Sequence, residues 1–445
     1  MVHFSVPMEV FMESIGIGIV GLGTVGAGVV EILLTRNESL SRAAGTRLEL
    51  VQVAARLPEE TAPYAAKGIA TTNDAMAMVE NPKVQIVVEV AGGYDVPMPW
   101  YRRALELGKP VVTANKALIA KHCGELFPLA AKHGTEIRFE ASVGGAIPVI
   151  RSLRDAFVGS EALSLACIIN GTTNFILSRM ASQGMEYNEA LTEAQRLGYA
   201  ESDPTFDVEG FDAAHKVAIL ASLCSGRKVD FQAMHVEGIS AITKADVAAA
   251  AELGCVVRLL GLVELQGDRV DARVHPCLVP KRHPLASVEG AYNAVFIDGT
   301  TAGQTLLYGK GAGRLPTASA VCADIADAAR QILSKLPPLD LSWFGHENAV
   351  LRPIEEAEGR YYLRLTVIDR PGVLGKIATV FGEEGVSVAE MIQHEADQSG
   401  QCPMVFHTHT SSEAAVQRAV ARVNAMPESA AAAMILRFYD RGLEE

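Results

Sequence analysis

The clearest candidates for proton-transfer chemistry lie in an acidic segment that ends in a lysine. Asp212 and Lys216 are four residues apart, so on a helix they share one face. The helix expected over Asp212–Leu223 is otherwise apolar, which places its charged residues at the mouth of a loop. A lysine in such a position can donate or accept a proton. The acidic run, which also contains Glu201 and Asp207, could instead be a solvated face.

A second lysine, Lys116, follows the apolar run Val111–Ala114. If that run is a parallel strand, Lys116 stands at its carboxyl end, where ligands gather in open α/β sheets. It is therefore a second candidate for contact with a ligand, although solvated lysines are common. His407 and His409 share one face of an expected strand, but no Cys or acidic partner stands at metal-ligand spacing, so we interpret them as structural.

A glycine-rich turn offers a site for phosphate groups. Gly21, Gly23 and Gly26 follow the apolar run Ile15–Val20 and open a helical run that extends to about Thr35. In a strand–turn–helix unit the first glycine permits the tight turn, the second lets the backbone approach a pyrophosphate, and the third lets helix and strand pack closely. The amino end of the helix adds amide donors and positive potential. The pattern predicts a dinucleotide site, the alternative being a purely structural turn.

The residue after the second expected strand bears on the choice of dinucleotide. The run Val51–Ala55 leads into Arg56 rather than into Asp or Glu. An acidic residue there accepts a hydrogen bond from a free ribose 2′-hydroxyl, whereas an arginine suits a 2′-phosphate. The sequence therefore favours NADP, with NAD possible, unless Arg56 is a solvated loop charge.

Composition limits the classes of function. The chain has 445 residues, 49% hydrophobic and 20% charged, which is typical of a globular protein with two or three domains. Its net charge of −13 argues against nucleic acid and membrane partners, because both require a basic face. No run approaches the roughly 18 apolar residues of a spanning helix, and Met1–Ser14 is unlike a signal peptide. The seven cysteines include no CxxC pair, so a cytoplasmic protein with reduced thiols is predicted.

The elements that must position these residues alternate in the first part of the chain. We predict an α/β fold that begins with a Rossmann-type doubly wound parallel sheet over residues 14–143, completed by a returning helix within about 308–335. Residues 144–307 should form an α+β catalytic and dimerisation domain. The runs behind this prediction are strands at Leu48–Ala55, Ile86–Val90, Val111–Thr113, Ile137–Glu140, Val256–Val263, Arg273–Leu278 and Ala294–Ile297, and helices at Trp100–Leu107, Ala117–His133, Ala190–Arg196, Ala213–Leu223 and Thr317–Leu333.

The C-terminal part has the pattern of a third, smaller domain. A Pro-containing and acidic linker is expected over 336–359, followed by a ferredoxin-like βαββαβ unit over 360–445. Its expected elements are Tyr361–Ile368, Val373–Gly382, Val386–His394, Met404–Thr410, Ser412–Asn424 and Ala433–Tyr439.

Several short segments, in this order and spacing, resemble homoserine dehydrogenase over nearly the whole chain. The family interconverts L-aspartate 4-semialdehyde and L-homoserine, a step toward threonine and methionine. No kinase domain is visible, so the resemblance is to the monofunctional form, with an ACT domain indicated by the segment 369–374. The segments are Gly21-Leu22-Gly23-Thr24-Val25-Gly26, Gly92-Gly93, 112–117, 140–148, Asn170-Gly171-Thr172-Thr173-Asn174, 198–204, 207–216 and Gly311-Ala312-Gly313.

The resemblance implies roles for individual residues. Lys216 would be the proton donor, Lys116 would lie at the cofactor and the reacting carbonyl, and Asp212 would support them. The residues that it assigns to the substrate are Glu201, which would hold the ammonium group, the supporting acid Asp207, and the pocket wall Tyr199, Thr172 and Gly171. Those that it assigns to the cofactor are Gly21, Gly23, Thr24, Val25, Gly26, Arg56, Gly92, Lys116 and Gly313.

The resemblance also implies bound partners. Family members hold a monovalent cation, usually sodium, in a loop like this one, and the candidate ligands are the main-chain oxygens of Glu140, Val143, Gly145 and Ile147. An ACT domain implies an amino-acid effector, with feedback inhibition by threonine as the hypothesis. It also favours a homodimer or homotetramer.

Two other functions stay open from the residues. A phosphorylating semialdehyde dehydrogenase would need a nucleophilic cysteine at a loop-to-helix site, and none of the seven is convincingly placed. A non-catalytic amino-acid sensor could keep the dinucleotide fold as a scaffold, but the lysines and acids of the expected site are all retained. Cofactor turnover distinguishes the sensor from the enzyme.

Overall fold

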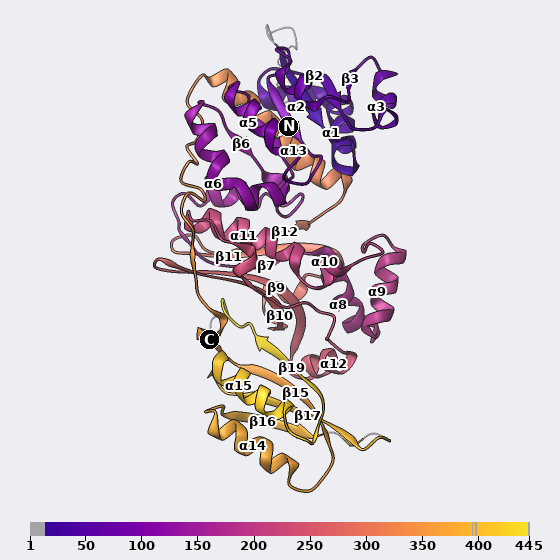
Figure 1. Cartoon of the computed structure of the whole chain (residues 1–445), viewed down its shortest axis with the longest axis vertical. Helices are drawn as coiled ribbons and strands as arrows, with labels where there is room; N and C mark the ends of the chain where they lie inside the picture. Colours follow the sequence, from indigo (N-terminus) through magenta and orange to yellow (C-terminus); the bar gives the residue numbers. More distant parts are fainter. Residues whose placement is uncertain (1–13, 394, 397, 444–445) are drawn as a thin grey trace, which may run out of the picture.

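The computed structural model describes residues 14–393, 395–396 and 398–443. Three regions follow one another along its longest axis, from the indigo and purple N-terminal region to the orange and yellow C-terminal one (Figure 1). The expected N-terminal extension over residues 1–13 lies outside the described residues, as do positions 394, 397, 444 and 445 of the expected third domain. Within the described ranges, no helix is long and apolar enough to cross a membrane.

The N-terminal region is built on a parallel sheet with the order β3-β2-β1-β4-β5-β6. This order confirms the expected doubly wound fold. Because β1 pairs with both β2 and β4, the strand order reverses there. In doubly wound folds the crevice that binds ligands lies at the carboxyl ends of the strands at such a reversal. The strands are β1 (Ser14–Val20), β2 (Arg47–Ala54), β3 (Ala70–Thr72), β4 (Ile86–Glu89), β5 (Val111–Thr113) and β6 (Ile137–Arg138).

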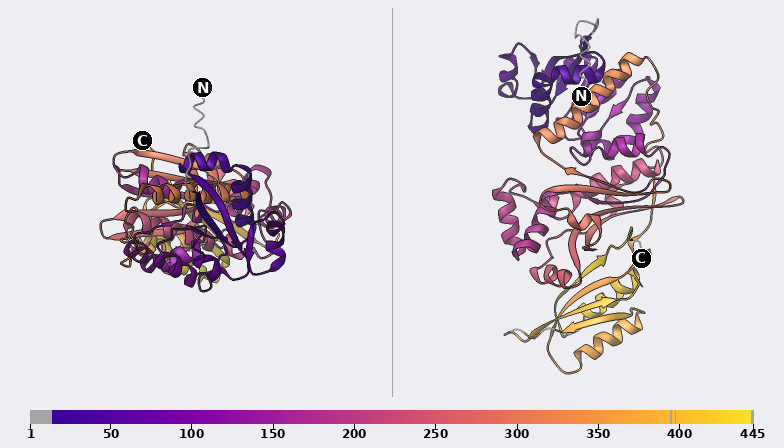
Figure 2. Two further views of the ribbon diagram at one scale, coloured as in Figure 1. Left: turned by 90° about the horizontal axis from the view of Figure 1, so that it is seen from above. Right: turned by 180° about the vertical axis from the view of Figure 1, so that it is seen from behind.

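Helices cover this sheet, and one of them comes from much later in the chain. The helix α13 (Arg314–Ser334) packs against α1, and the rear view shows it lying across the N-terminal region (Figure 2). Its buried side chains join the apolar cluster of β1 and α1. The other helices are α1 (Thr24–Thr35), α2 (Asn37–Ala44), α3 (Pro58–Ala65), α4 (Ala75–Glu80), α5 (Met98–Glu106) and α6 (Lys116–Lys132).

The central region is an antiparallel sheet with helices on one face. In the order β12-β11-β7-β9-β10, β10 also pairs with the short strands β8 and β13. The helix α11 lies close to the sheet because position 261 is glycine, where a Cβ would stand 2.2 Å from the Val217 side chain. Gly261 on β9 pairs with Val274 on β10, and paired residues point to the same face of the sheet. The helix α11 therefore covers the face to which Val274 points. The strands are β7 (Ala162–Ile168), β8 (His235–Val236), β9 (Cys255–Gln266), β10 (Arg269–Pro280), β11 (Tyr292–Gly299), β12 (Gly303–Lys310) and β13 (Val350–Leu351).

The helices of the central region bring the expected site residues to the side that faces the N-terminal region. The helix α11 packs against both α6 and the central sheet. The helices are α7 (Val149–Arg151), α8 (Gly171–Gln183), α9 (Tyr187–Arg196), α10 (Thr205–Val208), α11 (Phe211–Ser225) and α12 (Lys244–Glu252).

The C-terminal region has the expected βαββαβ order, and its sheet runs β19-β15-β17-β16. This sheet is not separate from the central one. The strand β19 pairs in parallel with β10 at Cys277–Arg437 and Leu278–Phe438, so the two sheets are continuous (Figure 1). The elements are β14 (Glu358–Gly359), β15 (Tyr361–Ile368), α14 (Val373–Glu383), β16 (Val388–Gln393), β17 (Gln401–Thr408), β18 (Ser411–Ser412), α15 (Glu413–Asn424) and β19 (Ser429–Phe438).

Among the differences from the sequence-based expectation, three concern the central region and its connections. The strand expected over Ile137–Glu140 ends at Arg138, because Glu140 begins a 3₁₀ turn, η2 (Glu140–Ser142), and its carboxylate accepts the main-chain N–H groups of Ile150 and Arg151. The strands β7 and β12, which the pattern of the sequence did not reveal, belong to the central sheet. The expected linker carries β13 and β14, both paired with strands elsewhere.

Candidate active site

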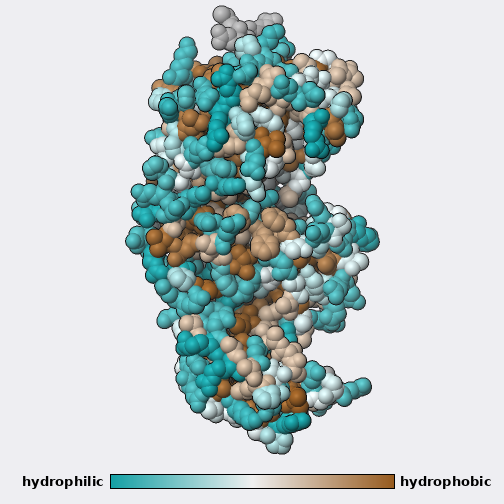
Figure 3. Space-filling model, in the orientation of Figure 1, coloured by the Kyte–Doolittle hydropathy of each residue, from teal (hydrophilic) through white to brown (hydrophobic). Residues whose placement is uncertain are grey.

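Two lysines and one aspartate meet where the N-terminal region faces the central region. Asp212 lies in the first turn of α11, and the Nζ atom of Lys216, one turn later, stands 2.6 Å from Asp212 Oδ2. Lys116, the first residue of α6, places its Nζ 3.3 Å from the other carboxylate oxygen. One carboxylate therefore holds two ammonium groups from different regions. The space-filling view shows an indentation between these regions (Figure 3).

The electrostatics of this cluster favour an ionised Asp212. Burial of the carboxyl opposes its ionisation, but the charges of Lys216 and Lys116 and the hydrogen bonds to it outweigh burial, so the pKa of Asp212 lies well below its usual value. Lys216 is itself only 12% exposed and also donates to the Ile169 carbonyl at 2.9 Å. An ammonium group has three N–H donors, so described residues use two and one is left for a ligand.

Asn170 joins this cluster to a second carboxylate. It caps the amino end of α8, and its Nδ2 donates to Asp212 Oδ2 at 2.9 Å and to Asp207 Oδ1 at 2.7 Å. The Thr172 hydroxyl lies 3.0 Å from Asp207 Oδ2 and 2.6 Å from the Tyr199 carbonyl oxygen. The structure therefore brings Asp207, Asp212, Thr172 and Tyr199 into one hydrogen-bonded group.

The remaining substrate candidates lie at the edge of this group. Tyr199 is 47% exposed, and its ring packs on that of Phe175, with 4.8 Å between ring centroids. Gly171 begins α8 where a Cβ would stand 2.9 Å from the Ala291 carbonyl oxygen, so a larger residue would push the helix away. The Glu201 side chain is exposed and has no hydrogen bond or ion pair with any described residue. The structure does not bring Glu201 onto the hydrogen-bonded group, and its role stays a prediction.

The glycine-rich turn between β1 and α1 has the geometry that a phosphate site requires. Gly21 has φ +94°, a conformation that favours glycine, and a Cβ there would stand 2.6 Å from the Ala91 nitrogen. A Cβ at Gly26 would stand 1.9 Å from the Gly21 carbonyl oxygen, so this position also needs glycine. In contrast, nothing lies within 4 Å of a Cβ at Gly23, and this open space lies at the amino end of α1. The turn fits a dinucleotide pyrophosphate.

The other cofactor candidates surround the same sheet edge. Thr24 and Val25 form the first turn of α1. Arg56 is exposed just beyond the carboxyl end of β2, beside the glycine turn, since the Gly21 N–H donates to the last residue of β2 at 2.9 Å. Gly313, with φ +120°, caps α13, which packs on α1.

Glu89 holds the loop that contains Gly92. It ends β4 and is 1% exposed. Its carboxylate accepts the N–H groups of Ala91 at 2.7 Å and Gly92 at 3.0 Å, and the Tyr101 hydroxyl at 2.7 Å. Asn115, directly before Lys116, donates at 3.1 Å to Glu89 Oε2, the same oxygen that accepts the Tyr101 hydroxyl. A buried acid thus fixes both the Gly92 loop and the start of α6.

The predicted cation loop has oxygen atoms suited to a hard cation. Val143 and Gly145 are buried, and among the described residues their main-chain oxygens accept no hydrogen bond. The oxygens of Glu140 and Ile147 each accept one, which leaves a lone pair on each. The loop also packs tightly, because a Cβ at Gly145 would stand 2.5 Å from Gly311.

Burial and the neighbouring carboxyl of Asp324 raise the pKa of the Glu140 side chain to about 7. Within the described part of the chain, no cluster of three or more His, Cys or acidic side chains could hold a metal ion.

Sequence reasoning assigned no role to three residues of this region, although two of them, Asn170 and His215, lie in segments that carry the family resemblance. Asn170 bridges two carboxylates, Glu89 orders two loops, and His215 precedes Lys216 with its ring 3.9 Å from that of Phe231. Burial first, and then the charge of Lys116, lower the pKa of His215. Glu89 could have been found as the only charged residue of the apolar run Ile86–Val90.

Three family profiles match successive parts of the chain. The NAD-binding domain of homoserine dehydrogenase matches residues 21–140, the homoserine dehydrogenase family matches 148–326, and the ACT domain matches 361–425. A homoserine dehydrogenase of Pseudomonas aeruginosa is 43% identical over 420 residues, which cover 93% of this chain and 96% of the relative. One of Corynebacterium glutamicum is 40% identical, with 96% of each chain covered.

This chain belongs to the homoserine dehydrogenase family. The crystal structure of a homoserine dehydrogenase from Thiobacillus denitrificans agrees with it, at a TM-score of 0.90 and 40% identity over 97% of this chain and 99% of that one. A hyperthermophilic archaeal homoserine dehydrogenase in complex with NADPH matches at a TM-score of 0.61 and 29% identity, over 73% of this chain and 99% of that one. The family is one of NAD(P)-dependent oxidoreductases, and the C-terminal region is an ACT domain, as the sequence predicted.

Proposed function

We propose that this homoserine dehydrogenase reduces L-aspartate 4-semialdehyde to L-homoserine reversibly, with Lys216 as the proton donor. The observation that carries the proposal is the contact of Lys216 and Lys116 with opposite oxygens of the buried Asp212. When bound, the reduced nicotinamide supplies the hydride to the aldehyde carbon. Lys216, anchored by Asp212 and the Ile169 carbonyl, directs its remaining N–H toward the developing alkoxide.

Lys116 and Asp212 have supporting roles in this proposal. Lys116 is one-third exposed, so it can contact a ligand in the crevice, and its charge stabilises negative charge on the reacting oxygen. Asp212 fixes the positions of both ammonium groups relative to each other. Because its own ionisation is strongly favoured, it keeps an anion next to Lys216 while that lysine loses its proton to the product.

The substrate would bind along the hydrogen-bonded group that Asn170 organises. Thr172 and Tyr199 form its wall, and Gly171 leaves room at the amino end of α8. The exposed carboxylate of Glu201 would bind the substrate ammonium group, with Asp207 as the supporting acid. This assignment of the substrate contacts rests on the family resemblance and on the shared location of most of these residues.

We propose NADP as the preferred cofactor, bound across the carboxyl ends of β1 and β2. The amino end of α1 would take the pyrophosphate over Gly23, and Arg56 would pair with the 2′-phosphate. Replacing Arg56 with Glu should reduce the preference for NADP over NAD by about tenfold or more, as loss of one charge-assisted contact implies. The kcat/KM values of the two cofactors measure this, and an unchanged ratio in the variant would remove Arg56 from the site.

The buried carbonyl oxygens of Val143 and Gly145, which accept no hydrogen bond from the residues that the structure describes, support our proposal of a monovalent cation, with sodium as the candidate. The cation would complete the junction between the N-terminal and central regions. We further propose that the ACT domain binds an amino-acid effector, with threonine as the first candidate, and that the enzyme acts as a homodimer or homotetramer.

One assay tests the central proposal. The purified protein is mixed with L-homoserine and either NADP or NAD, and absorbance at the nicotinamide band is followed. We expect reduction of NADP and a weaker signal with NAD. Folded protein that reduces neither cofactor would contradict the proposed reaction and favour a sensor that keeps this fold as a scaffold.

A further inference from the structure

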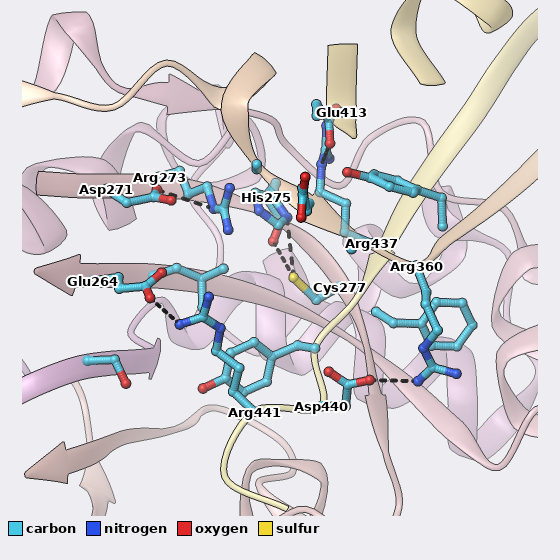
Figure 4. A pocket seen from close by; sticks show the side chains of 18 of the residues that line it. Glu264, Asp271, Arg273, His275, Cys277, Arg360, Glu413, Arg437, Asp440 and Arg441 are labelled. Carbon is cyan, nitrogen blue, oxygen red and sulfur yellow. Dashed lines mark hydrogen bonds and ion pairs between the residues drawn. The ribbon is translucent and has the colours of Figure 1, made fainter. Parts of the chain in front are cut away.

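A cavity of about 260 Å³ lies where the ACT domain joins the central sheet. The strand β10 lines one side with Asp271, Arg273, His275 and Cys277, which alternate along the strand and so share one face. This face is opposite the one covered by α11. The start of β15 and the end of β19 line the other side, and Figure 4 shows the labelled side chains arranged around the space.

Two charged groups on this face are poorly paired. Among the described residues, the Arg273 guanidinium donates no hydrogen bond, although its side chain is only 16% exposed, and its nearest acidic oxygen is on Asp271 at 3.5 Å. The Asp271 carboxylate likewise has ion-pair contacts only at 3.5 Å and, with Arg352, at 3.7 Å. The Nε2 atom of the fully buried His275 is also without a partner in the described chain. Buried charges and donors of this kind are unfavourable unless a ligand satisfies them.

The charge balance around the cavity identifies the class of ligand. Four arginines and five acidic residues line it, so it is close to neutral overall but contains both signs. A phosphate compound would meet too many carboxylates, and a divalent cation would meet too many guanidinium groups. A zwitterion fits, because Arg273 can bind a carboxylate and Asp271 an ammonium group. The volume is below the range typical of drug-sized ligands, which suits a single amino acid.

The cavity wall is connected to the candidate active site by a short chain of contacts. Arg437, which lines the cavity, donates to both oxygens of Glu237 at 2.8 Å. Two residues further on, the Ile239 N–H donates to the Val208 carbonyl at 2.8 Å. Val208 ends α10, and its neighbour Asp207 belongs to the group around Asn170. These contacts form a continuous hydrogen-bonded connection from Arg437 to the proposed substrate site, through which the two could be coupled.

We propose that the cavity between β10 and the ACT domain is an effector site for a small α-amino acid, with Arg273 binding its carboxylate, Asp271 its ammonium group, and Arg437 and Glu237 linking it to α10. The site lies at the start of β15, whereas the turn Asp369–Gly372 follows the other end of that strand. The inference deepens the effector control proposed above and rests on it.

Direct binding to the full-length protein tests the site without relying on turnover. The common L-amino acids are titrated one at a time by calorimetry into the wild type and the variants Arg273→Gln, Asp271→Asn and Arg370→Gln. We expect at least one amino acid to bind the wild type, and its amide, which lacks the carboxylate, not to compete. Arg273→Gln and Asp271→Asn should each weaken binding by about tenfold or more, as loss of a charge-assisted contact implies. Arg370→Gln, in the exposed turn, is the matched control and should bind as the wild type does.

The link to α10 has a test that needs no substitution. Because coupling between two ligands is reciprocal, homoserine without cofactor must change the affinity for the amino acid by the same factor that the amino acid changes the affinity for homoserine. We expect the two affinities to change by equal factors that differ from 1. If homoserine and the amino acid bind independently of each other, the link is overturned.

Several outcomes would overturn the cavity site. One is that no amino acid binds the wild type, and another is that binding is lost only in Arg370→Gln. A third is that Arg273→Gln and Asp271→Asn change the oligomeric mass. That result would mean that Arg273 and Asp271 contact a second copy of the chain rather than a ligand. If Arg273→Gln does not fold, Asp271→Asn decides alone. Amino-acid binding by a protein that does not oxidise homoserine would refute the proposed reaction and leave the cavity site standing.

Discussion

The central sheet carries a charged cluster on each side, and the two clusters are organised in opposite ways. Near α11, Asp212 receives two lysines within 3.3 Å and an amide hydrogen bond. On the opposite face of β10, the ion pairs of Asp271 with described residues are limited to two arginines, at 3.5 and 3.7 Å. The pKa of each carboxyl reflects these distances. Burial opposes ionisation of both carboxyls, but the nearby positive charges outweigh burial only at Asp212. The pKa of Asp212 is therefore lowered and that of Asp271 is raised.

This difference separates two uses of a buried carboxylate. A fully paired acid is held rigidly and can position reacting groups, as catalysis requires. A poorly paired acid next to a poorly paired base is unfavourable without a ligand and offers both groups to one. We interpret the Asp212 cluster as catalytic and the Asp271 cluster as a binding site on this ground.

The largest expected effect comes from removing the amine that Asp212 positions. Lys216→Ala should lower kcat by a factor on the order of 10² to 10⁴, the usual contribution of a general acid, while the affinity for NADPH is retained. Single-turnover kinetics and a cofactor fluorescence titration measure the two quantities. Lys132→Ala, at the exposed end of α6, is the matched control and should leave both unchanged. A variant of Lys216 with nearly normal single-turnover rate would assign the proton to another group.

Breaking the paired cluster at its centre should destabilise the protein. Asp212→Asn leaves Lys216 and Lys116 without their counter-charge, and removing one partner of a buried pair typically costs about 3 kcal/mol or more. The free energy of unfolding, from urea titration monitored by circular dichroism, gives the value. A loss below about 1 kcal/mol, the level of surface pairs, would show that the cluster is not as buried as its contacts indicate.

The two aspartates should affect the pH dependence of stability with opposite signs. The pKa of Asp212 is depressed by folding, so its stabilising contribution is complete above the usual carboxyl pKa of 3.8 and is lost as the pH falls below that value. The pKa of Asp271 is raised, so the folded state retains its proton longer and stability falls as the pH rises from 3.8 through the raised value. Unfolding titrations over a pH series should therefore show a weaker acid-side loss in Asp212→Asn and a weaker decline toward neutral pH in Asp271→Asn.

The smallest expected effect is an increase in the stability of the folded protein. At neutral pH, without effector, Asp271→Asn should stabilise the protein by about 1 kcal/mol or less, because it removes an unfavourably buried charge from the proposed effector site. Thermal unfolding of ligand-free wild type and variant measures the gain. Destabilisation by Asp271→Asn would mean that its arginine contacts at 3.5 and 3.7 Å pair it adequately, and the contrast with Asp212 would fail.

Local patterns in the sequence predicted the parts of the fold and site whose causes are local. The glycine turn, the four-residue spacing of Asp212 and Lys216 and the βαββαβ order of the ACT domain all appear where expected, since each depends on residues close in the chain. The strand expected to reach Glu140 was too long, because a buried contact of its carboxylate with two later N–H groups redirects the chain.

Which distant residues meet follows from the way the elements pack, and no local pattern reveals it. This packing placed Lys116 on the second oxygen of Asp212, made Asn170 the bridge between Asp207 and Asp212, and continued the ACT sheet into the central sheet through β10 and β19. The fold class, the family and the types of residues available for chemistry could all be read from the order of the amino acids alone. Periodicity and spacing report which face of its own element a residue occupies, whereas the packing of elements far apart in the chain determines what that face touches, and so creates both charged clusters.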